Sequence, residues 1–128
     1  GPGVVLTNDT YPRAVNPDLS QKSGDDWDAV GVDIGDGAAI GARSVCVAPM
    51  RIGAWALVAA VSVVTRDVPD FGLVAGVPAK RIGWVGRTGR RLEEKDGVWV
   101  CPDTGETFIE RDGALRPAGP AQEEENHG

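Results

Sequence analysis

Apolar residues recur every six positions over a continuous stretch of the chain. They are Ile34, Ile40, Cys46, Ile52, Val58 and Val64, and Gly35, Gly41 and Gly53 follow three of them. Four places after the first five stand mostly small residues, namely Ala38, Ser44, Met50, Ala56 and Ser62. A period of six fits neither the spacing of an α-helix nor the alternation of a single strand. It predicts a solenoid in which each hexad forms one short strand and one corner, with the apolar residue pointing inward. Three hexads would close one triangular turn, and successive turns would stack about 4.8 Å apart.

The segments on either side of the repeat predict other structures. Residues 3–6 read as a short strand, and residues 7–31 break the period, which indicates a polar loop insertion. Residues 97–110 predict a small β-hairpin, held together by Val98, Trp99, Val100 and Phe108. From residue 117 onward the composition indicates a disordered acidic tail. We therefore expect a solenoid domain over residues 1–85, a hairpin extension over 86–116 and a tail over 117–128.

The distribution of charge changes what the composition implies about ligands. The 128 residues suit one domain, and 13 basic against 19 acidic residues give a net charge of −6. This balance argues against nucleic acid or an anionic membrane as the main partner. Residues 43–91, however, hold eight basic and two acidic residues, whereas both flanking parts are acidic. The basic middle third is therefore suited to a small phosphorylated ligand.

Several features bear on location and on the ends of the chain. The longest apolar stretch, residues 55–64, is far shorter than the ~20 residues that span a bilayer, and no signal segment opens the chain. The two cysteines are too few for a disulfide scaffold, so we expect a cytoplasmic protein. The chain begins Gly1-Pro2-Gly3 and its only methionine is Met50, so we expect a processed product, a tag remnant or a fragment.

Three segments together resemble a known family. They are Thr7-Asn8-Asp9-x-Tyr11-Pro12-Arg13-Ala14, the Ile-Gly hexads, and Val74-Ala75-Gly76-Val77-Pro78-Ala79-Lys80-Arg81-Ile82-Gly83-Trp84-Val85. They resemble the hexapeptide-repeat acyltransferases, which implies an all-β fold, a left-handed parallel β-helix. The first segment is similar to that of nucleotide-linked 3-amino-sugar N-acetyltransferases. The resemblance covers residues 1 to about 110, and it implies that the chain is the C-terminal part of a longer enzyme.

The resemblance also implies a function, partners and an assembly. It implies transfer of an acetyl group from acetyl-CoA to the amino group of a UDP- or dTDP-linked 3-amino sugar. Each active site would lie between neighbouring solenoids of a homotrimer. Another hexapeptide O- or N-acyltransferase, such as a serine acetyltransferase, is the nearest alternative. A catalytically inactive solenoid used for assembly or binding is the other, because the only histidine, His127, lies in the acidic tail.

The candidate catalytic and sugar-binding residues lie in the first motif. The resemblance implies that Asn8 contacts the sugar amine, while Asp9 holds or deprotonates it. An amide can orient an amine without ionising. The alternative is an Asx turn that closes the strand ending at Leu6. Tyr11 and Arg13 are candidates for binding the sugar nucleotide.

The candidate residues for acetyl-CoA come from the basic middle third and the corners. Coenzyme A carries a pyrophosphate and a 3′-phosphate, for which Lys and Arg are natural partners. The candidates for these phosphates are Arg66, Lys80 and Arg81, the last two on the family's exit coil. Small residues near Ala42, Ala59 and Ala60 would let the pantetheine arm approach the backbone. Arg43 and Val61 stand where relatives often carry Gly or Ala, so either could narrow this groove.

The two cysteines carry separate predictions. Cys46 occupies an inward repeat position and reads as a small buried hydrophobe. Some relatives carry a zinc knuckle at places that here read Gly86, Thr88, Cys101 and Thr104. One thiol among four positions cannot hold structural zinc, so we predict no metal.

Overall fold

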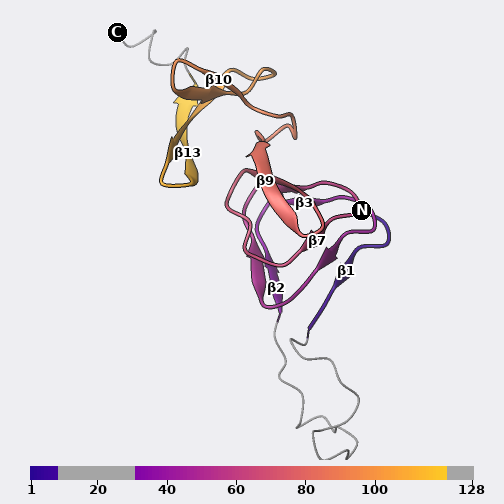
Figure 1. Ribbon diagram of the computed structural model, residues 1–128. Coiled ribbons are helices and arrows are strands. Elements are labelled where there is room, and N and C mark those ends of the chain that lie inside the picture. Colours follow the sequence, from indigo (N-terminus) through magenta and orange to yellow (C-terminus); the bar gives the residue numbers. More distant parts are fainter. Residues whose placement is uncertain (9–30, 121–128) are drawn as a thin grey trace, which may run out of the picture.

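The computed structural model describes residues 1–8 and 31–120, and the regular structure in this part is entirely β (Figure 1). The solenoid strands are β1 (Val5–Leu6), β2 (Val32–Ile34), β3 (Ala39–Ile40), β4 (Val45–Cys46), β5 (Met50–Ile52), β6 (Leu57–Val58), β7 (Val63–Val64) and β8 (Gly72–Gly76). The last strand of the solenoid, β9 (Ala79–Trp84), pairs with β8 in the antiparallel direction. The remaining strands are β10 (Glu93–Lys95), β11 (Val98–Val100), β12 (Glu106–Arg111) and β13 (Ala114–Pro120). The described part contains no helix that is long and apolar enough to cross a membrane.

Parallel pairing stacks the short strands into three sheets. Sheet 1 contains β1, β4 and β7, sheet 2 contains β2 and β5, and sheet 3 contains β3, β6, β8 and β9. Residue 45 pairs with residue 63, and residue 32 with residue 50, so one turn takes 18 residues. Because 18 residues are three hexads, the predicted triangular coil is confirmed.

The three corners form three edges that run along the solenoid. The alanine edge, between sheets 3 and 1, comprises residues 41–44, 59–62 and 75–78. The asparagine edge, between sheets 1 and 2, comprises residues 7–8, 47–49 and 65–67. The tryptophan edge, between sheets 2 and 3, comprises residues 35–38, 53–56 and 69–72. These edges hold the candidates Asn8, Ala42, Ala59, Ala60 and Arg66, whereas Lys80 and Arg81 lie in β9.

The repeat residues form the interior of the coil, as predicted. Cys46, Ile52, Val58 and Val64 are at most 2% exposed, and Val68 and Val74 continue the stack. Ser44, Met50, Ala56 and Ser62, four places after their anchors, also point inward and are buried. Ile34 differs, because its side chain is 44% exposed. It lies in the first complete coil, and only Leu6 and its neighbours precede that coil among the described residues.

Two of the edges are built from tight turns with a left-handed third residue. Gly37, Arg43, Trp55, Val61 and Phe71 have φ between 59° and 72°. This conformation defines a type II turn and favours glycine. Each turn also bonds to the coil before it, as when the Val61 N–H donates to the Ala42 carbonyl at 2.9 Å. The strain at the non-glycine positions is therefore offset by stacking of the turns.

Replacing Val61 by asparagine is expected to stabilise the protein. Val61 is β-branched, has φ 59° and is 65% exposed, so it contributes strain and little packing. Asparagine tolerates this conformation, and relief of the strain should raise the free energy of unfolding by about 1 kcal/mol. Urea unfolding measures this change. Val63→Asn, in the adjoining strand, is the control and should destabilise the fold; a loss of stability in both variants would contradict the argument.

Beyond the last coil the chain forms a second apolar cluster and a second sheet. Strands β10 to β13 form an antiparallel sheet that lies beyond one end of the solenoid (Figure 1). Phe71 and Trp84 from the solenoid pack there with Leu92, Cys101, Phe108 and Leu115. The expected hairpin is present as β11 and β12, with Trp99 opposite Phe108.

The prediction for the C-terminal segment is partly wrong. The expected hairpin is the centre of a four-stranded sheet, and residues 117–120, expected in the tail, belong to β13. Leu115 is buried and Pro117 pairs with Phe108, which ties this segment to the sheet. An edge strand accepts proline because its outer N–H needs no partner. Residues 121–128 lie outside the described residues.

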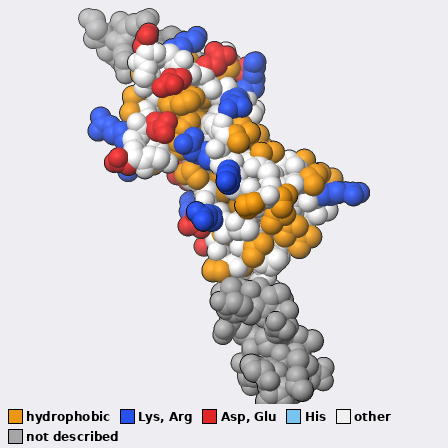
Figure 2. Space-filling model, viewed as in Figure 1, with side chains coloured by type: hydrophobic (Ala, Val, Ile, Leu, Met, Phe, Trp, Pro, Cys, Tyr) orange, Lys and Arg blue, Asp and Glu red, His pale blue; other side chains and the backbone are white. Residues whose placement is uncertain are grey.

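The outer faces of the sheets differ in polarity. Val5, Val45 and Val63 form a row across the outer face of sheet 1, where Val5 is 51% exposed. Asp33 and Arg51 occupy the outer face of sheet 2 and are exposed. Hydrophobic side chains gather over the coils around β1 and β7 (Figure 2). Sheet 1 therefore presents an apolar face between the asparagine and alanine edges.

Candidate functional site

The predicted site residues fall on two edges of the solenoid. Leu6 pairs with Cys46, and Cys46 with Val64, so Asn8 and Arg66 lie in one row on the asparagine edge. The alanine edge carries Ala42, Ala59 and Ala60, and Lys80 pairs with Ala75 at its end. Sheet 1 separates the two rows. Asp9, Tyr11 and Arg13 lie outside the described residues.

At the asparagine edge a threonine, rather than Asn8, closes the strand. The Thr7 N–H donates to the Cys46 carbonyl at 3.0 Å, and the Thr7 hydroxyl accepts the Ala48 N–H at 2.8 Å. Asn8 is exposed, and its side chain makes no hydrogen bond to another described residue. Within the part of the chain that the structure describes, its amide is therefore uncommitted. That Thr7 closes the strand could have been inferred from its position, because it directly follows the strand that ends at Leu6.

At the alanine edge two backbone donors lack an acceptor within the described residues. In the middle coil of the other two edges the equivalent N–H groups bind side-chain oxygens: that of Ala48 binds Thr7 Oγ1, and that of Ala54 binds Asp70 Oδ1 at 2.9 Å. The N–H groups of Ala42 and Ala60 have no such partner among the described residues. They lie one coil apart, about 4.8 Å. Because exposed N–H groups bind oxygen strongly, this edge can hold an extended ligand that bears carbonyl groups.

The three predicted cofactor cations line one pocket at the end of the solenoid. This pocket is about 440 Å³ and is lined by Val64, Thr65, Arg66, Asp67, Val68, Pro69, Val74, Pro78, Ala79, Lys80 and Arg81. Val64, Val68 and Val74 are the last inward residues of the coil, so the pocket lies where the stack ends. Arg66 and Lys80 are exposed and make no ion pair within the described part.

Arg81 has partners within the protein. Its guanidinium lies 4.2 Å from the centre of the Trp84 ring and 3.8 Å from a Glu110 carboxylate oxygen. These contacts join the last solenoid strand to the C-terminal sheet. Among the predicted phosphate ligands, Arg66 and Lys80 are therefore the two whose charges are uncommitted over residues 1–8 and 31–120.

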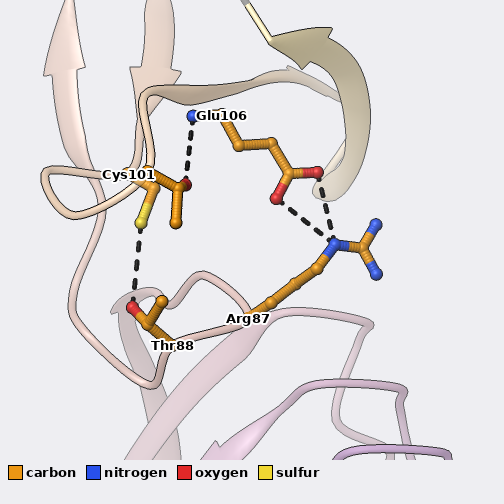
Figure 3. A network of polar contacts seen from close by, with 5 residues as sticks. Arg87, Thr88, Cys101 and Glu106 are labelled. Atoms are coloured by element: carbon orange, nitrogen blue, oxygen red, sulfur yellow. Dashed lines mark hydrogen bonds and ion pairs between the residues drawn. The ribbon is translucent and has the colours of Figure 1, made fainter.

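The four places that correspond to the zinc knuckle of some relatives lie around one sulfur atom. Thr88 Oγ1 is 3.8 Å from Cys101 Sγ, and a Cβ at Gly86 would lie 3.2 Å from it (Figure 3). Burial acts to raise the pKa of the Cys101 thiol, but hydrogen bonds from Thr104, Asp103 and Thr88 outweigh it and lower the pKa. Beside this thiol, Arg87 Nε lies 3.3 Å from Glu106 Oε1 and joins the two loops (Figure 3).

These four places contain one thiol, and hydroxyl and backbone groups stand where a zinc site would need further thiols. Within the described ranges no group of three or more His, Cys, Asp or Glu side chains could hold a metal ion. Cys46 is fully buried, as predicted, and burial raises the pKa of its thiol. Neither cysteine forms a disulfide.

Comparisons with known proteins point to acetyltransferases, although no family model matches the sequence. dTDP-3-amino-3,6-dideoxy-alpha-D-galactopyranose 3-N-acetyltransferase of Aneurinibacillus thermoaerophilus is 44% identical over 79 residues, which are 62% of this chain and 41% of that protein. Serine acetyltransferase 4 of Arabidopsis thaliana is 53% identical over 53 residues, which are 41% of this chain and 15% of that protein. The chain therefore spans less than half the length of these relatives.

A solved structure supports the fold. Galactoside acetyltransferase in complex with coenzyme A matches with a TM-score of 0.50 and 26% identity, over 74% of this chain and 46% of that one. The expected left-handed parallel β-helix is confirmed by this likeness together with the three parallel sheets.

Proposed function

We propose, from its homology to hexapeptide-repeat acetyltransferases, that this chain is part of an acetyl-CoA-dependent N-acetyltransferase that acts on a nucleotide-linked 3-amino sugar. The observation that carries the proposal is the row of two N–H groups on the alanine edge that have no acceptor among the described residues, and this row leads to the basic pocket. An extended donor molecule with amide carbonyls and phosphates complements both features.

Acetyl-CoA would lie along the alanine edge. Its pantetheine arm carries amide carbonyls that the N–H groups of Ala42 and Ala60 can bind, in the manner of an added strand. Its phosphates would reach Lys80, with Arg66 across the same pocket. This places the thioester toward the earlier coils. Asn8 lies at that level of the solenoid, on the other side of sheet 1.

Replacing Ala60 by proline is expected to weaken binding of CoA about tenfold, the loss of one well-placed hydrogen bond. Ala60 is the second residue of its turn, a place where proline is favoured in type II turns, and Pro2 holds the equivalent place two turns earlier on the same side of the solenoid. The change therefore removes the N–H and keeps the turn. Calorimetric titration with CoA measures the effect.

Ala54→Pro is the matched control, because it removes the equivalent N–H on the tryptophan edge. That N–H is bonded to Asp70, so this variant should lose stability but keep its affinity for CoA. If the Ala60→Pro variant and the unaltered protein bind CoA with equal affinity, the proposal that CoA lies along the alanine edge is wrong.

We propose a homotrimer in which the apolar outer face of sheet 1 is turned toward the three-fold axis. The row of Val5, Val45 and Val63 and the exposed Val77 supply the apolar surface for such contacts. In this arrangement the alanine edge of one copy faces the asparagine edge of the next. Asn8 of one copy would then complete a site in which the groups that bind acetyl-CoA belong to the neighbouring copy.

The chemistry within such a site needs few groups. The Asn8 amide would hold the sugar amine beside the thioester carbonyl. The amine nitrogen forms a bond to the carbonyl carbon, the carbon–sulfur bond breaks, CoA leaves as a thiolate, and the amine gives up one proton. Asp9 is the proposed acceptor of that proton. Tyr11 and Arg13 are proposed to bind the nucleotide-linked sugar, and Ala59 to line the donor groove.

The test is the release of thiol from acetyl-CoA by the intact protein. We expect release with dTDP- or UDP-linked 3-amino sugars and none with the matching 3-hydroxy sugars or with L-serine. Release with L-serine alone would favour the serine acetyltransferase alternative. If CoA neither binds nor turns over, the enzyme proposal fails and the inactive solenoid remains. The same proposal places the protein in the cytoplasm, in agreement with its two free cysteines.

A further inference from the structure

Two serine hydroxyls lie inside the solenoid directly beneath the alanine edge. Ser44 is 0% exposed and Ser62 is 1% exposed, and they are the buried polar residues of the described part. The equivalent inward place on the tryptophan edge holds alanine, at Ala38 and Ala56. Burying a hydroxyl group costs free energy unless the group forms hydrogen bonds. The two serines therefore need hydrogen bonds beneath the alanine edge.

Both hydroxyls bind the same backbone carbonyl. Ser62 Oγ donates to the Ala59 carbonyl at 2.7 Å, and Ser44 Oγ donates to it at 3.0 Å. In return the Ser62 N–H donates to Ser44 Oγ, and the Gly76 N–H donates to Ser62 Oγ, each at 3.2 Å. The two side chains thus link three successive coils through one carbonyl group.

This network replaces the usual bond of the turn. In the preceding coil the Ser44 N–H donates to the Gly41 carbonyl, which closes that turn across four residues. In the turn of residues 59–62 the corresponding N–H is bonded to Ser44 Oγ instead. The direction of the Ala59 carbonyl therefore depends on the two hydroxyls.

The direction of that carbonyl also sets the direction of a ligand-binding group. The peptide bond between Ala59 and Ala60 is trans, so the carbonyl and the following N–H point in opposite directions. Because the hydroxyls hold the carbonyl toward the interior, the Ala60 N–H points away from it. An N–H group that is already oriented before the ligand arrives loses less entropy when it binds the ligand.

We propose that Ser62, together with Ser44, is a positioning residue for the donor substrate, which it serves by orienting the Ala60 N–H toward a carbonyl of the pantetheine arm. This inference rests on the proposed function. Ser62 itself touches no substrate, because its side chain is buried beneath the turn.

The experiment compares Ser62→Ala with Val58→Ala, which removes packing from the same coil without touching the network. We expect Ser62→Ala to raise the KM for acetyl-CoA about tenfold, the effect of one misplaced hydrogen bond, while kcat and the KM for the amino sugar stay within about twofold. Val58→Ala should lower Tm at least as much and leave all three constants unchanged. In an Ala60→Pro background, which has no N–H to orient, Ser62→Ala should cause no further rise in KM.

A measurement without substrate separates this inference from the proposed function. The amide residual dipolar coupling of Ala60 should change in Ser62→Ala and not in Val58→Ala. An unchanged coupling, a KM effect that adds to that of Ala60→Pro, or an equal KM effect of Val58→Ala would each overturn the role of Ser62. If the unaltered protein binds no CoA while the coupling changes as expected, the orientation of the peptide holds and the proposed function fails.

Discussion

Replacing Asn8 by alanine is expected to lower the rate of acetyl transfer about 100-fold or more, the usual cost of losing one polar group that acts in the transition state. Asn8 is exposed, its amide is uncommitted among the described residues, and Thr7 already supplies the contact that closes the strand. The loss should therefore appear in turnover and leave Tm unchanged. Thiol release at saturating acetyl-CoA, together with thermal unfolding, measures both quantities.

Two controls sharpen this prediction. Asp33→Ala, at an exposed position on the outer face of sheet 2, should leave turnover unchanged. Asn8→Ala should also leave the affinity for CoA unchanged, because the donor-binding groups lie on another edge. If turnover survives the loss of Asn8, the asparagine edge has no catalytic role.

Mixing two defective variants tests whether the site is shared between copies. Co-expression of Asn8→Ala with Ala60→Pro gives mixed trimers in which some interfaces combine an intact asparagine edge with an intact alanine edge. Random assembly of equal amounts should restore about one quarter of the interfaces. If both edges served one site within a single chain, no intact site would form, and activity at limiting acetyl-CoA would stay at the level of the separate variants.

Replacing Trp84 by alanine is expected to lower the free energy of unfolding by about 3–5 kcal/mol, as for other large buried aromatic residues. Trp84 is 0% exposed and packs in the cluster that joins the solenoid to the C-terminal sheet. Its Nε1–H donates to Glu110 Oε1 at 3.2 Å, and Arg81 stacks on its ring. The variant therefore loses apolar contacts, the hydrogen bond to Glu110 and the ring on which Arg81 stacks, although Arg81 and Glu110 keep their ion pair. Equilibrium urea unfolding measures the loss.

Two further variants divide this loss into its parts. Trp84→Phe keeps most of the ring and removes the indole N–H, so it should cost about 1 kcal/mol. Trp99→Ala removes a half-buried ring from the edge of the same cluster and should cost less than Trp84→Ala. A loss below about 1 kcal/mol for Trp84→Ala would show that the cluster contributes little to stability.

Most of the solenoid could be predicted because its physical cause is local. Each hexad carries its own inward apolar residue and its own corner residue, so Ile52 and Val58 were identified without knowledge of what lies across the coil. The C-terminal segment was harder, because Pro117 and Gly119 read as tail residues. Their place in β13 depends on pairing with Phe108 and Thr107 in the preceding strand, which the composition of the segment does not indicate.

The candidate site shows the same division. Arg66, Lys80 and Arg81 were identified by charge, and the structure does bring them to one pocket, but Arg81 proves to be engaged by Glu110 and Trp84. The unpaired N–H groups of Ala42 and Ala60 had no sequence signal. They are recognised only by comparison with Ala48 and Ala54, whose N–H groups donate to side-chain oxygens of Thr7 and Asp70.

The period of six residues by itself determined the coil, its inward residues and the number of hexads in each turn. The reason is that every hexad carries the same local pattern of an inward apolar residue and a corner residue. The tertiary structure alone decided which edge carries which chemistry. That choice depends on side chains one coil above or below, such as Thr7 over Ala48 and Ser44 beneath Ala59. Contacts of this kind join residues 14 to 41 positions apart in the chain, and no local pattern records them.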